Sequence, residues 1–234
     1  MDDTLIPNAY SYYVPQLDAT KIICLDLMWA APNPVIIINR ACEIQIKDIA
    51  KKGGISKECF PMSFIEVYKE LCEASSLTPN VAVISAIFDS AQRFFLKEYT
   101  VFDNVKETLT KIKLKKIIVT RGDFDIQDYK VDSTRLHNFV DAVEIVRLKS
   151  AQTYTDLINK FNLIPEETAM VGDSINNDII PALEAGLYAF HVNKHQDDWE
   201  TIHVPSTKKK ISGKYTRKVI SITTFSEILP HLDT

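Results

Sequence analysis

The 234-residue chain has the composition of an ordinary globular protein, with 46% hydrophobic and 25% charged residues. Its formal net charge of -4 argues against general nucleic-acid binding, which favours a basic surface. No apolar run approaches the roughly 20 residues that span a bilayer, and the acidic start Met1-Asp2-Asp3 is unlike a secretory signal. The four cysteines are widely spaced, as expected of reduced thiols. We therefore expect a cytoplasmic protein with neither a nucleic-acid nor a membrane partner.

The first part of the chain has the pattern of a helical subdomain. From about Tyr10 to Tyr99, apolar residues recur at helical spacing, for example in Ser63–Ala74 and Val81–Phe95. Prolines and the pair Gly53-Gly54 separate these stretches. We predict a helical cap over residues 10–99, inserted into a core made of residues 1–9 and 100–234.

From Val101 onward, strand and helix patterns alternate. Short apolar runs predict buried strands and a final edge strand: Ile117–Thr120, Val143–Val146, Ala169–Val171, Ala189–Val192 and Val219–Phe225. Amphipathic stretches predict the helices between them: Val105–Lys113, Ile126–Leu136, Ala151–Phe161 and Ile179–Ala185. Ser226 is the expected N-cap of a last short helix. This alternation predicts an α/β fold, a doubly wound parallel sheet with helices on its faces.

The most informative segment is Ala169–Gly186, which reads AMVGDSINNDIIPALEAG. Asp173 and Asp178 follow an apolar strand pattern, at the edge where open α/β sheets bind their ligands. Carboxylate oxygens of this kind suit a hard cation such as Mg²⁺. The pattern indicates a metal and phosphate site, although capping of the following helix is an alternative role for Asp178.

Two further strand ends carry groups that bind phosphate. Thr120 ends an apolar strand and leads into Arg121 and Gly122, where a hydroxyl donor and a closely approaching backbone can meet a phosphate oxygen. Lys149 follows the next strand and offers a point positive charge. His191 and His195 have the spacing of a helical metal site, but His191 falls in a strand pattern, so we expect surface or packing roles for them.

Together, Thr120, Lys149 and the run Gly172–Asp178 resemble the second, third and fourth motifs of the haloacid dehalogenase superfamily. The first motif of that family is Asp-x-Asp-x-Thr-Leu, at the end of the first strand. The segment Met1–Leu5 matches it from the second position onward. The resemblance makes Asp2 the acid/base aspartate and puts the nucleophilic aspartate one position before Met1.

The strand that carries the nucleophile lies at the centre of the family's sheet, and a parallel sheet needs its central strand. We therefore expect an open reading frame that begins upstream of Met1. Two other residues are candidates for the nucleophile. With Asp2 as nucleophile, Thr4 stands where the second aspartate belongs. Asp26 follows the apolar run Ile22–Leu25, but its surroundings predict a helix.

The resemblance implies a Mg²⁺-dependent phosphatase of a small phosphorylated metabolite that works through an aspartyl-phosphate. Asp2 acts as acid and base, and Thr120 and Lys149 hold the phosphoryl group, assisted by Arg121 and Gly122. Asp173 binds the metal, together with the missing aspartate and the backbone carbonyl of Asp2, and Asp178 completes or orients this shell.

Within the superfamily, dehalogenases lack the acid/base aspartate and need no metal, so Asp2 favours phosphoryl transfer. A phosphotransferase with the same core residues is not separated from a phosphatase by the sequence. The alternative from another class is a catalytically inactive relative that binds a phosphorylated ligand or a partner.

Overall fold

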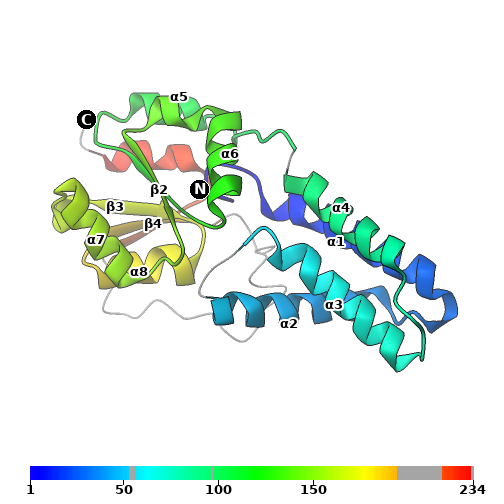
Figure 1. The fold of residues 1–234 in the computed structure, drawn as a ribbon. Helices are drawn as coiled ribbons and strands as arrows, with labels where there is room; N and C mark the ends of the chain where they lie inside the picture. The colour runs from blue at the N-terminus through cyan, green and yellow to red at the C-terminus, as the bar shows by residue number, and fades with distance from the viewer. Residues whose placement is uncertain (53–55, 96, 194–217, 233–234) are drawn as a thin grey trace. The chain divides into compact units, whose positions relative to one another are not determined.

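A computed structural model of the chain describes residues 1–52, 56–95, 97–193 and 218–232. The chain divides into two compact units (Figure 1). One contains Met1–Pro7 and Tyr99–Thr234, and the other contains Asn8–Glu98. Among the described helices, none combines the length and the apolar character needed to cross a bilayer.

The Asn8–Glu98 unit is helical, in the part of it that the structure describes. Its α-helices are α1 (Ala9–Leu27), α2 (Pro34–Lys52), α3 (Cys59–Ala74) and α4 (Val81–Phe95), and a short 3₁₀ turn, η1 (Met28–Ala30), follows α1. The helices pack as the pairs α1 with α4, α2 with α3 and α3 with α4. Their apolar faces bury large side chains, of which Tyr68 and Phe64 have almost no exposed surface.

The other unit alternates strands and helices, as the sequence pattern predicts. Its strands are β1 (Ile117–Arg121), β2 (Ala142–Val146), β3 (Ala169–Gly172), β4 (Tyr188–Val192) and β5 (Val219–Ile222). Its α-helices are α5 (Val105–Lys111), α6 (Phe124–Thr134), α7 (Ala151–Phe161) and α8 (Ile180–Glu184). Single turns complete it: η2 (Leu136–Phe139), η3 (Pro165–Glu167), η4 (Ile175–Ile179) and η6 (Phe225–His231).

All pairings between the described strands are parallel, but they form two separate sheets. The first sheet has the order β1-β2, with Ile117 opposite Ala142. The second has the order β3-β4-β5, with Ala169 opposite Tyr188. The sheet of this unit is therefore interrupted between β1 and β3.

Helices cover both faces of these strands, as in a doubly wound fold (Figure 1). On one face, α5 and η6 lie side by side and bury Val105, Leu109 and Ile228 against the strands. On the other face, α7 packs against α8 and buries Tyr154 beside Ala182. The predicted parallel α/β fold is confirmed, apart from the interruption of the sheet.

Local hydrogen bonds explain where several of these elements begin and end. Helix α7 begins after Ser150, whose hydroxyl accepts from the Thr153 amide at 3.2 Å, and it ends at Asn162 in the left-handed conformation. Gly186, with φ of 93°, ends the segment after α8 as the sequence predicts.

One local prediction was wrong. The final turn is capped by Thr224 rather than Ser226, because Thr224 and Glu227 form a reciprocal capping box. The helix predicted over Ile179–Ala185 is present as α8, and it is preceded by a π-helical turn, η4, in which Ser174 caps the Asn177 amide at 3.2 Å. Such turns are frequent at functional sites, and this one carries Asp178.

Candidate functional site

The predicted site residues meet at the carboxyl ends of β1 and β3. At the end of β1, the Thr120 hydroxyl is buried and donates to Gln127 Oε1 at 2.8 Å. Gln127 Nε2 in turn donates to Asp2 Oδ2 at 3.3 Å. Lys130 Nζ lies 2.9 Å from both carboxylate oxygens of Asp2. A hydrogen-bonded chain thus links the end of β1 to the first residues of the protein through α6.

The environment of Asp2 keeps it ionised. Burial acts to raise the pKa of its carboxyl group, but the charge of Lys130, the amino-terminal ammonium and the hydrogen bonds outweigh it, so the pKa lies below its usual value. The Lys130 side chain is only 4% exposed and also lies over the Tyr99 ring, 5.2 Å from its centroid. Asp2 is therefore held in its ionised form, which can accept a proton but has none to donate.

A buried ion pair joins the loop after β2 to the π-helical turn. Lys149 Nζ lies 2.6 Å from Asp178 Oδ1, and both side chains are almost fully buried. Asp178 also accepts from the Ser174 amide at 3.2 Å. Burial acts to raise the pKa of Asp178, but the ammonium of Lys149 outweighs it and holds this pKa below its usual value. Asp178 thus orients Lys149 as well as bonding to the start of its own turn.

Gly172 is required beside this pair. A Cβ atom at Gly172 would overlap the Asp178 side chain, which packs directly on the backbone at the end of β3. Asp178 cannot retreat without leaving Lys149, so the glycine and the ion pair depend on each other.

Asp173, which directly follows β3, differs from Asp2 and Asp178 in that its surroundings raise the pKa of its carboxyl group. Its Oδ1 accepts from the Thr4 hydroxyl at 2.9 Å, and its backbone oxygen lies 2.9 Å from His191 Nε2. Burial, and then the negative charge of Asp178, raise the pKa of Asp173 to about 7. The Asp173 side chain is partly buried, and the nearby negative charges of Asp178 and Asp3 favour a positive ion beside it, which is the electrostatic setting of a cation ligand. A single carboxylate of this kind fits a Mg²⁺ ion that keeps several waters.

The three predicted metal carboxylates do not form one cluster. In the part of the chain that the structure describes, no group of three histidine, cysteine or acidic side chains is arranged to hold a metal ion. Asp2 pairs with Lys130, Asp178 pairs with Lys149, and Asp173 accepts from Thr4. Two of the three carboxylates thus face a lysine ammonium, whereas Asp173 accepts from the uncharged Thr4 hydroxyl.

Arg121 and Gly122 have structural neighbours of their own. Arg121 Nη1 donates to Asn177 Oδ1 at 2.9 Å, which ties the end of β1 to the π-helical turn after β3. A Cβ atom at Gly122 would lie 2.7 Å from Gln127 Nε2, so the glycine makes room for the link between Thr120 and Asp2.

Sequence reasoning missed Gln127 and Lys130, although they lie three residues apart and so share a face of α6. Both are buried. Lysine and glutamine in an amphipathic helix usually face solvent, and only a contact with Asp2, far away in the sequence, distinguishes these two. His191 contacts Asp173 from β4, whereas His195 lies outside the described residues. Asp26, the other candidate nucleophile, lies in α1 and accepts from the Tyr68 hydroxyl at 2.6 Å, so it does not end a strand.

Comparison with known proteins identifies the family. Residues 1–186 match the family model described as haloacid dehalogenase-like hydrolase. The chain therefore belongs to the haloacid dehalogenase-like hydrolases, as its motifs predict. A search of curated proteins found no significant match.

Solved structures share the fold at low sequence identity. A haloacid dehalogenase-like family hydrolase from Xanthomonas campestris is 19% identical and superposes with a TM-score of 0.75, over 98% of this chain and 86% of that one. A 2-haloacid dehalogenase from Pseudomonas syringae is 16% identical, with a TM-score of 0.64 over 99% and 94% of the two chains. The HAD-hydrolase YfnB from Bacillus subtilis, solved bound to magnesium, is 14% identical, with a TM-score of 0.63 over 100% and 96%. At these identities the likeness establishes the fold alone.

Proposed function

We propose that this hydrolase is a Mg²⁺-dependent phosphatase of a small phosphorylated metabolite, and that its nucleophilic aspartate enters the site on a strand that leads into Met1. The observation that carries the proposal is the set of groups at the carboxyl ends of β1 and β3. Asp173 has the setting of a cation ligand, the Lys149 ammonium is held in place by Asp178, and Asp2 is available as a proton acceptor. A cation, a phosphate-binding ammonium and a base are the groups that hydrolysis of an aspartyl-phosphate requires.

Each residue then has a defined task. Thr120 and Lys149 hold the phosphoryl oxygens, and their burial excludes water that would weaken these contacts. Asp2, ionised beside Lys130, takes a proton from the water that attacks the aspartyl-phosphate. For the earlier step, in which the leaving alcohol is protonated, Asp2 has to carry a proton and therefore to loosen its contact with Lys130.

Asp173 and the backbone carbonyl of Asp2 would hold Mg²⁺, and the ion would neutralise charge on the phosphoryl oxygens. Asp178 supports this arrangement from outside by fixing Lys149 and the turn that follows Asp173. The structure of YfnB bound to magnesium supports the choice of metal for a protein of this fold.

Two other functions remain as competitors. A dehalogenase is favoured by relatives such as the Pseudomonas syringae enzyme, but Asp2 is the aspartate that dehalogenases of the superfamily lack. A non-catalytic binding protein would use the same Thr120, Lys149 and Asp173 to hold a phosphorylated ligand without forming a covalent intermediate.

The test compares two reactions of one protein. The 234-residue chain is produced with an apolar strand ending in aspartate fused directly before Met1, and it is assayed with p-nitrophenyl phosphate and with 2-chloropropionate. We expect phosphate release that is abolished by EDTA and restored by Mg²⁺, and no chloride release. Chloride release without metal would establish the dehalogenase, and failure to release either product would favour the binding protein. A matched fusion that ends in asparagine is expected to be inactive.

A further inference from the structure

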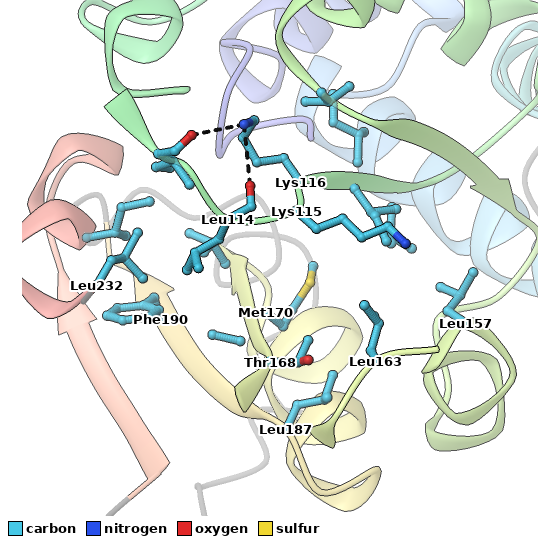
Figure 2. A pocket seen from close by; sticks show the side chains of 18 of the residues that line it. Leu114, Lys115, Lys116, Leu157, Leu163, Thr168, Met170, Leu187, Phe190 and Leu232 are labelled. Carbon is cyan, nitrogen blue, oxygen red and sulfur yellow. Dashed lines mark hydrogen bonds between the residues drawn. The ribbon is translucent and has the colours of Figure 1, made fainter. Parts of the chain in front are cut away.

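An exposed apolar surface lies at one end of the helical unit. It differs from the cavity of about 440 Å³ beside β1 and β3, which is lined by residues of the α/β unit and belongs to the interruption of the sheet (Figure 2). The chain enters the helical unit before α1 and leaves it after α4, and these two helices pack against each other. The end of the unit that is remote from the entry and the exit carries two connections, from α1 to α2 and from α3 to α4 (Figure 1).

One side chain joins the two connections by hydrogen bonds. The Tyr68 hydroxyl, on α3, donates to Asp26 Oδ2 at 2.6 Å and accepts from the Asn80 amide at 2.9 Å. Asp26 lies in the last turn of α1, and Asn80 directly precedes α4. Residues 25–35 and 77–81 therefore contribute to one and the same end surface.

Large apolar side chains on this end surface are exposed to solvent. Six of them form the tip patch: Leu25, Met28, Trp29, Val35, Leu77 and Val81. Trp29 is 92% exposed and Val81 is 78% exposed. With these exposed fractions, the six residues present about 700 Å² of accessible surface. The largest apolar patch on a typical monomer covers about 300–600 Å², and larger patches mark interaction sites.

The tip patch carries almost no charge. Residues 25–35 and 77–81 contain one charged residue, Asp26, whose carboxylate accepts from the Tyr68 hydroxyl. The core of a protein–protein interface is likewise depleted of charged residues and enriched in tryptophan and methionine. Segments that bind a lipid surface combine apolar residues with lysine and arginine, and neither of these two segments contains either residue. The composition therefore favours a protein partner.

Local hydrogen bonds fix both connections before any partner binds. The Asn33 side chain accepts from the Val35 amide at 2.9 Å, and the Asn80 side chain accepts from the Ala82 amide at 3.0 Å. Each asparagine thus caps the helix that follows it. Prolines adjoin both asparagines and restrict the backbone further. A surface that is already ordered loses little conformational entropy when it associates.

We propose that the tip patch is a self-association surface, on which a second copy of this chain docks through its own tip patch. A two-fold axis allows the same residues to serve both copies. Together with the polar atoms around it, a patch of this size approaches the area of about 800 Å² that each partner buries in a stable complex. An identical patch is equally apolar and brings no charge that the interface would leave unpaired. The inference does not rest on the proposed function, because the tip patch contains none of the site residues.

Sedimentation velocity of the full chain at about 1 to 100 µM measures the association directly. Two variants, Trp29→Ser and Val81→Ser, each remove one side chain from one of the two connections. The matched control is Leu17→Ser. Leu17 is 60% exposed on the same helix as Leu25 but lies about 12 Å before it along the axis. All three side chains are exposed, so we expect the substitutions to leave the fold of the helical unit unchanged.

We expect the chain to form a dimer, and Trp29→Ser to raise its dissociation constant by at least about thirtyfold, since tryptophans buried at an interface are frequent hot spots. Val81→Ser is expected to raise the constant by about tenfold, and Leu17→Ser by less than about twofold. A chain that stays monomeric throughout would overturn the proposal, as would a dimer that neither tip variant weakens. Co-sedimentation of a monomeric chain with neutral phosphatidylcholine vesicles would overturn it in favour of a lipid surface.

Discussion

Replacing Lys149 by methionine removes the ammonium that compensates the buried carboxylate of Asp178. The pair is short, with 2.6 Å between Lys149 Nζ and Asp178 Oδ1, and its side chains are 7% and 4% exposed. Removing one partner of a buried pair costs about 3–5 kcal/mol, because the remaining charge is left without solvent or partner. Here the cost is increased by Asp173, whose charge already acts on Asp178. We expect a loss of stability of about 3–5 kcal/mol for the α/β unit.

The matched control is Lys160→Met, which breaks the pair between Lys160 and Glu144 at 2.8 Å. In this pair the lysine is 58% exposed, so the expected loss is about 0–1 kcal/mol. Native-state hydrogen exchange at β3 and β4 measures both variants within the same unit. The smallest expected difference, about 2 kcal/mol, corresponds to about a thirtyfold faster exchange for Lys149→Met.

A double variant tests the cause of the loss. Lys149→Met combined with Asp178→Leu removes both charges, and we expect it to be more stable than Lys149→Met alone because no uncompensated carboxylate remains. Equal exchange in Lys149→Met and Lys160→Met would refute the account of a buried, compensating ion pair. A double variant no more stable than Lys149→Met would show that lost packing, not charge, dominates.

Three further substitutions have defined outcomes. Gly172→Ala is expected to lower stability by about 1–3 kcal/mol in the same exchange assay, because the new methyl group overlaps the Asp178 side chain. An unchanged exchange rate would mean that the turn carrying Asp178 shifts without cost. Tyr68→Phe removes the hydroxyl that donates to Asp26, and we expect the free energy of unfolding of the helical unit in urea to fall by about 1–2 kcal/mol. An unchanged free energy of unfolding would contradict a stabilising role for this hydrogen bond. Thr4→Val is expected to destabilise the α/β unit by about 1–3 kcal/mol, because the Asp173 carboxylate loses its hydroxyl donor. Thr4→Ser keeps a hydroxyl and is expected to retain most of the stability. Equal losses in the two variants would show that packing, not the hydrogen bond, is responsible.

The regular part of the fold could be predicted because its signals are local. The apolar run at Ala169 and the helical spacing of Ala151–Phe161 depend on neighbours within a few residues, and the structure has both elements close to the predicted bounds. The error at the last turn arose because two nearby residues, Thr224 and Ser226, are both good N-cap residues. Thr224 caps the last turn because Glu227 lies three residues after it and completes the capping box, which Ser226 cannot do.

The site was harder to predict because its contacts join distant segments. The strand-end positions of Thr120 and Asp173 followed from the alternation of strands and helices. The partners of Asp2 did not, since Lys130 is 128 residues away in sequence and has the appearance of a surface lysine. The pairing of Lys149 with Asp178 was likewise missed, because each residue alone was expected to face a phosphate or a metal. Burial explains these pairings, because a charged side chain in the interior is costly unless it pairs with an opposite charge.

The most direct test of the account is to trap the covalent intermediate. The fusion whose apolar strand ends in aspartate before Met1 is combined with Asp2→Asn, mixed with p-nitrophenyl phosphate and Mg²⁺, quenched in acid and examined by peptide mass spectrometry. We predict a phosphoryl group on the aspartate that precedes Met1, because the amide at position 2 cannot activate the water that removes it. Absence of this adduct, with phosphate still released in solution, would contradict the assignment of the nucleophile and of Asp2.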